Sequence, residues 1–60
     1  MSIDRRIIQL LRPARADDKA SHFYVVIGRE AIVRDCRSYR AALQFAGKLD
    51  RAEVMVREED

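Results

Sequence analysis

The sequence predicts one small α+β domain, in which an antiparallel sheet of three to four strands packs on a single helix. Three segments carry this prediction: a run of strand-forming residues that folds back on itself at 22–36, an amphipathic segment at 38–49, and an alternating segment at 52–57. The 60 residues make one domain, 1–60, because domains rarely have fewer than about 50 residues.

Residues 22–36 are typical of a β-hairpin. His-Phe-Tyr-Val-Val-Ile is rich in strand formers, and Ala-Ile-Val-Arg-Asp-Cys is the returning strand. Gly28 begins the turn, because glycine accepts the positive φ of tight hairpin turns. Successive side chains alternate between the two faces of a strand. The first strand therefore has two apolar sets: Phe23, Val25 and Ile27 on one face, Tyr24 and Val26 on the other. The second face needs a cover, from the N-terminal segment, a twin subunit or a target.

Residues 38–49 are predicted to form the helix, with Ser38 as a good N-cap. Apolar side chains recur there at helical spacing: Tyr39, Ala42, Leu43, Ala46 and Leu49. Residues 52–57 alternate as a strand, and Val54 and Val56 are expected to face the core. The acidic tail 58–60 is expected to fray.

Residues 3–12 fit two interpretations equally well. Their apolar residues have the spacing of an amphipathic helix, whereas the β-branched pair Ile7-Ile8 favours a fourth strand. Residues 13–21 follow as a loop without periodicity, containing Pro13 and the pair Asp17-Asp18. Surface connections of this kind are the most mobile parts of a domain, so we expect this loop to be flexible.

The composition argues against several classes of site and location. Cys36 is the only cysteine, so an internal disulfide is impossible, and one Cys with one His cannot supply a structural zinc site. A lone free thiol suits a reducing compartment, and no long apolar run indicates a signal peptide or a membrane span. We therefore expect a cytoplasmic protein without a cofactor, a metal or a membrane partner.

Catalysis has little support in the sequence. His22, Asp35 and Cys36 form the only set that could provide a nucleophile with a base. A catalytic thiol also needs an oxyanion hole and a substrate cleft, and a chain of this length has little material for either. Asp17-Asp18 lacks the spacing of a calcium loop. We predict a protein that is not an enzyme and has no small-molecule substrate.

Arginine is the most informative residue type, since ten of the twelve basic residues are Arg. Arg34, Arg37 and Arg40 recur at every third position, and Arg29 lies at the hairpin tip. They could pair internally with Asp35 or Glu30. Together with the N-terminus of the helix they could instead bind an external anion. The bias is also what GC-rich bacterial or phage genomes produce.

These features lead to two functional hypotheses. The first is a non-catalytic protein-binding module, a small regulator or inhibitor that acts through a sheet face and its arginine rim, either on another protein or as a homodimer. Its expected contact residues are aromatic, aliphatic and arginine side chains: Tyr24, Val26, Arg29, Arg34, Arg37 and Arg40. The alternative is a nucleic-acid-binding protein whose Arg34, Arg37 and Arg40 contact phosphates, with affinity that falls steeply as salt is added.

Overall fold

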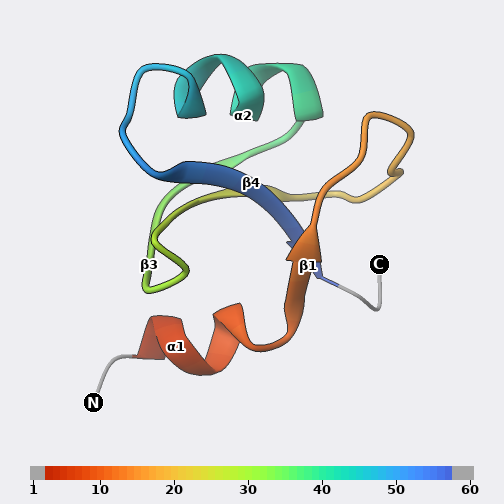
Figure 1. The fold of residues 1–60 in the computed structure, drawn as a ribbon. Coiled ribbons are helices and arrows are strands. Elements are labelled where there is room, and N and C mark those ends of the chain that lie inside the picture. The colour runs from red at the N-terminus through yellow and green to blue at the C-terminus, as the bar shows by residue number, and fades with distance from the viewer. Residues whose placement is uncertain (1–2, 58–60) are drawn as a thin grey trace.

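The computed structural model describes residues 3–57, and their side chains from residue 6 onward. Its elements follow the order α1 (Ile3–Ile8), β1 (Leu11–Pro13), β2 (Phe23–Ile27), β3 (Ala31–Cys36), α2 (Tyr39–Ala46) and β4 (Ala52–Arg57). The four strands form one antiparallel sheet in the order β1-β4-β2-β3. The predicted α+β fold is confirmed, and the two helices lie on opposite faces of the sheet (Figure 1).

The α2 face of the sheet holds the larger of two apolar clusters. It combines strand and helix side chains, all buried: Phe23, Val25, Cys36, Ala42, Ala46, Val54 and Val56. The expectation that Val54 and Val56 face the core is therefore confirmed. Ala42 and Ala46 are the buried residues of α2, and their short side chains allow the helix to lie close to the strands.

On the opposite face, the N-terminal segment covers the second apolar side of the hairpin. Its cluster consists of Ile8 from α1, Leu11 from β1, Val26 from β2 and Met55 from β4. Val26 has no exposed surface at all. Each interpretation of residues 3–12 therefore holds for part of the segment, which forms a helix over 3–8 and a strand from residue 11. A twin subunit is not needed to cover this face.

Two details of the predicted helix were wrong. The helix spans Tyr39–Ala46, so it ends before the predicted limit at residue 49. Leu43, assigned to the buried stripe, is 51% exposed. The reason is that α2 rests on its small residues Ala42 and Ala46 with Phe45 at the flank, which turns Leu43 toward solvent.

The hairpin has the expected turn and an unexpected bulge. Gly28 and Arg29 both have positive φ, 60° and 57°, a conformation that glycine adopts without a steric penalty. Val25 pairs with Arg34, whereas the next residue, Val26, pairs with Ile32. Val33 is therefore the extra residue of a β-bulge. Because of this shift, Ile32 and Arg34 lie on opposite faces of the sheet.

The loop between β1 and β2 is held at several points. The guanidinium of Arg12 donates two hydrogen bonds to the carboxylate of Asp18, at 2.6 and 3.0 Å. The Ala14 amide donates to the Val54 carbonyl at 2.9 Å, and Ala14 and Ala20 pack on the α2-side cluster. The predicted fraying of 58–60 lies outside the described residues. Within residues 3–57, neither helix is long and apolar enough to cross a lipid bilayer.

We predict that Ile8→Val destabilises the domain, because it removes a buried methylene from the contact between α1 and the sheet. The expected loss in the free energy of unfolding is about 0.5–1.5 kcal/mol, measurable by urea denaturation. Leu10 is 52% exposed, so Leu10→Ser is the control and should change stability by no more than about 0.5 kcal/mol. Equal effects of the two variants would contradict the packing of α1 described above.

A second prediction concerns pH. The side chain of Arg12 and the backbone amide of Arg15 donate to Asp18 and lower its pKa from 3.8 to about 2. A carboxyl group with a lowered folded-state pKa stabilises the protein above its unfolded-state value, and this contribution disappears as the pH falls through the folded-state value. Asp18→Asn should therefore lower the unfolding midpoint at neutral pH and flatten its dependence on pH between 3.8 and 2.

The matched control for this variant is Asp17→Asn, at the exposed neighbouring position. It should leave the acid limb of the pH profile nearly unchanged. If the two variants flatten the profile equally, Asp18 is not the group that fastens the loop.

Candidate functional site

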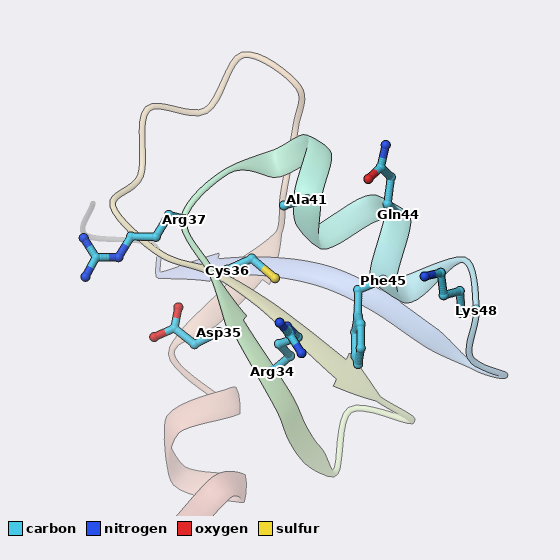
Figure 2. Close-up of a pocket in the computed structure, with 8 residues that line it drawn as sticks. All are labelled: Arg34, Asp35, Cys36, Arg37, Ala41, Gln44, Phe45 and Lys48. Carbon is cyan, nitrogen blue, oxygen red and sulfur yellow. The ribbon is translucent and has the colours of Figure 1, made fainter.

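The described surface has a groove of about 570 Å³ between α2 and the edge strand β3. Figure 2 shows the side chains that line it. Eight residues line the groove: Arg34, Asp35, Cys36, Arg37, Ala41, Gln44, Phe45 and Lys48.

The side chains on each wall of the groove follow the periodicity of the element that carries them. On β3, Arg34 pairs with Val25 and Cys36 pairs with Phe23, and cross-strand partners share a face. Both side chains therefore point to the α2 side of the sheet, whereas Asp35 points to the α1 side. On the α2 wall, the lining residues Ala41, Gln44 and Phe45 have the i, i+3, i+4 spacing of one helix face, and Lys48 continues this spacing in the turn just after α2.

The groove is cationic. The guanidinium carbon of Arg34 lies 4.8 Å from the centre of the Phe45 ring, which is cation–π geometry. Arg37 and Lys48 also belong to the lining of the groove, and both are exposed. Asp35 is the only carboxylate in the lining, and it accepts a hydrogen bond from His22 Nδ1 at 3.0 Å. Within residues 6–57, no salt bridge neutralises Arg34, Arg37 or Lys48.

The start of α2 adds to the positive potential. The predicted N-cap is confirmed, since the Ala41 amide donates to Ser38 Oγ at 3.1 Å. The first turn of α2 contains no acidic residue, and Arg40 occupies that turn. Because the N-terminus of a helix dipole is positive, Arg37 and Arg40 are slightly unfavourable there, by about 0.3–1 kcal/mol each at most. This arrangement costs stability, and within residues 6–57 no salt bridge pairs Arg37 or Arg40 with a carboxylate.

Only some of the arginines that were predicted to share one surface lie together in the structure. Arg34 and Arg37 line the groove, but Arg40 lies on the exposed side of α2, outside the lining. Arg29 is at the hairpin tip, where its Nε donates to Glu53 Oε1 of β4 at 2.9 Å. The sequence suggested Asp35 as a partner for these arginines, whereas the structure pairs Asp35 with His22.

The apolar part of the predicted contact set lies elsewhere. Tyr24 is half-buried on the α1 face, where its ring stacks on His22 with centroids 6.0 Å apart. Val26 is fully buried beneath α1, so it cannot contact a partner while α1 is in place. The six residues therefore do not form one continuous surface, and the groove uses two of them.

The set proposed for thiol chemistry is also separated. Cys36 is a buried free thiol on the α2 face, opposite Phe23 in the register. His22 is bonded to Asp35, whose side chain is on the other face. Among the described residues, no group of three His, Cys, Asp or Glu side chains is placed to hold a metal ion.

The wall of the groove at α2 was not predicted from the sequence. Gln44 and Lys48 lie four residues apart beside the predicted apolar stripe, and Phe45 lies between them in the sequence. Their helical spacing with Ala41 was a usable signal. Its meaning depended on where α2 crosses the sheet, which no local pattern gives.

We predict that Arg34 and Phe45 are energetically coupled. A cation–π contact at a partly exposed site contributes about 0.5–1 kcal/mol, so a double-mutant cycle with Arg34→Gln and Phe45→Leu should return a coupling energy of that size. The measurement is urea unfolding of the four proteins. A control cycle with Arg37→Gln in place of Arg34→Gln should give no coupling. A zero value in the first cycle would contradict the stacked position of Arg34.

Comparisons with protein-family models, with curated proteins and with solved structures gave no match for this chain. Three features of the described residues bear on function: the groove between α2 and β3, its cations that form no salt bridge within residues 6–57, and the edge strand that forms one wall.

Proposed function

We propose that this protein is a non-catalytic binding module whose groove between α2 and β3 receives an acidic part of another protein. The single observation that carries the proposal is the cationic lining, since Arg34, Arg37 and Lys48 line the groove together with the apolar side chains of Ala41 and Phe45. Arginine is suited to such contacts, because its planar guanidinium can donate two parallel hydrogen bonds to a carboxylate.

The placement of charge supports an external partner. Arg37 and Arg40 lie at the end of α2 where cations reduce stability, and the only acidic lining residue is bonded to His22. Residues placed against local stability are common at functional sites. A module of this size acts by occupying a surface of its partner, as a small regulator or inhibitor. The lone cysteine suits a reducing compartment such as the cytoplasm.

The reason for proposing self-association through the sheet face does not hold in the structure. That hypothesis required an uncovered apolar face around Tyr24 and Val26, and Ile8 and Leu11 pack on this face. We therefore propose a heterotypic partner as the primary function.

Nucleic acid remains the alternative occupant of the same cations, because Arg34 and Arg37 could equally contact phosphates. The groove offers little for bases to stack on, since Arg34 already covers Phe45 and Tyr24 lies on the opposite face. We therefore favour protein, and the experiment below separates the two.

We predict that removal of the three groove cations strongly weakens partner capture. The triple variant Arg34→Gln, Arg37→Gln, Lys48→Gln should lose proteins that the native chain enriches from nuclease-treated extract of its host. Each exposed ion pair contributes about 0.2–1 kcal/mol, so the affinity for a purified captured partner should fall by about tenfold.

The matched control is Arg6→Gln, Arg15→Gln, Lys19→Gln, which removes the same charges from exposed positions outside the groove. It should capture the same proteins as the native chain. If both triple variants lose the same proteins, capture depends on net charge and the groove is not the site. If nuclease treatment alone removes the captured material, the ligand is nucleic acid.

A further inference from the structure

β3 is an edge strand of the sheet, and no other described strand pairs with its outer side. In the strand order β1-β4-β2-β3, β3 pairs with β2 on one side only. An edge strand presents backbone N–H and C=O groups along its outer side that can pair with another chain. The same strand forms one wall of the cationic groove through Arg34, Asp35 and Cys36.

A groove between an edge strand and a helix suits one mode of peptide recognition. Domains that bind peptides by β-augmentation add an extended segment to an exposed sheet edge, where backbone hydrogen bonds supply affinity and pockets for alternate side chains supply specificity. Here Ala41, Gln44 and Phe45 of α2 form one wall, with Lys48 just beyond the end of the helix, and β3 forms the other wall (Figure 2).

We infer that the partner enters the groove as an extended acidic segment that pairs with β3 as a fifth strand. This inference rests on the proposed function and adds the form of the ligand to it. The pairing region is Arg34–Cys36, the part of β3 beyond the bulge at Val33.

The two faces of β3 define the pattern of the segment. Cross-strand neighbours lie about 4.5–5.5 Å apart and on the same face. The partner residue beside Arg34 faces α2 and should be Asp or Glu. The partner residue beside Cys36 also faces α2, next to Ala41, and should be small and apolar. One residue separates these two positions, and further acidic residues can reach Arg37 and Lys48 at the ends of the groove.

A second copy of this chain fits the edge poorly. Antiparallel self-pairing about a two-fold axis centred on Arg34 sets two Arg34 side chains opposite each other, and centring on Asp35 does the same for two carboxylates; directly opposed like charges are destabilising. Centring on Val33 meets the bulge, and centring on Cys36 runs into the bend at 37–38 that leads to α2. An acidic foreign strand has none of these conflicts.

The test begins with a displayed library of random nine-residue peptides, selected on the full chain as bait. The Gln variant of the three groove cations is the counter-selection bait, and the Gln variant of Arg6, Arg15 and Lys19 is the charge-matched control. We expect enrichment of peptides with an acidic and a small apolar residue separated by one position. These peptides should bind the control and not the groove variant.

The strand geometry is tested with the most enriched peptide, synthesised with its natural backbone and with N-methyl groups on one alternate set of amides or on the other. In an added edge strand, one set of N–H groups faces β3 and the other faces solvent. N-methylation of the first set should weaken binding at least tenfold, and N-methylation of the second should change it less than threefold. Hydrogen exchange at the β3 amides should slow on binding.

The outcomes separate this inference from the proposed function. If both N-methylated peptides bind equally well, or both lose binding equally, strand addition is wrong, while dependence on the three cations keeps the groove as the site. If no acidic peptide is enriched on the native chain, the extended acidic ligand is wrong, and the capture experiment with the two triple variants decides the proposed function by itself.

Discussion

The packing of both faces of a very small sheet is the constraint on which the rest of this structure depends. The two central strands carry apolar side chains on each side, with Val25 and Val54 toward α2 and Val26 and Met55 toward α1. Neighbouring residues with opposite orientations are buried together, so one helix cannot cover them. The chain meets this demand with α2 on one side and the short α1 on the other (Figure 1).

The same constraint creates the groove. A helix of eight residues, seated through Ala42 and Ala46, lies close to the sheet but is too short to cover all four strands. From α2, Phe45 reaches the edge strand and stacks against Arg34 of β3. The surface left between helix and edge strand collects Arg34 and Arg37 because β3 leads directly into the start of α2. The groove therefore exists because α2 is short, and it is positively charged because the arginines lie where β3 leads into α2.

Local patterns in the sequence predicted much of this architecture. The hairpin turn at Gly28, the cap at Ser38 and the alternation of Val54 and Val56 are each set by neighbouring residues, and each is confirmed. The division of residues 3–12 into helix and strand was not predictable, because Ile7, Ile8, Leu10 and Leu11 satisfy both periodicities and tertiary packing decides between them.

The candidate site was less predictable than the fold. The spacing of Arg34 and Arg37 pointed to it, but Arg29 was assigned to the same surface and instead pairs with Glu53. That ion pair depends on β4 lying beside β2, a consequence of strand order that the arginine spacing cannot reveal. Lys48 joins the site through the position of α2 across the sheet, which is also a tertiary property.

The central claim is that the surface between α2 and β3 is open and positively charged. Near-surface electrostatic potential can be measured at each backbone amide by NMR, from the ratio of relaxation enhancements caused by an anionic and a cationic nitroxide of the same size. We expect the most positive potentials of the chain at the amides of residues 34–37 and 44–48. A uniform potential, or a maximum near Arg12 and Arg15 with neutral values along the groove, would contradict it.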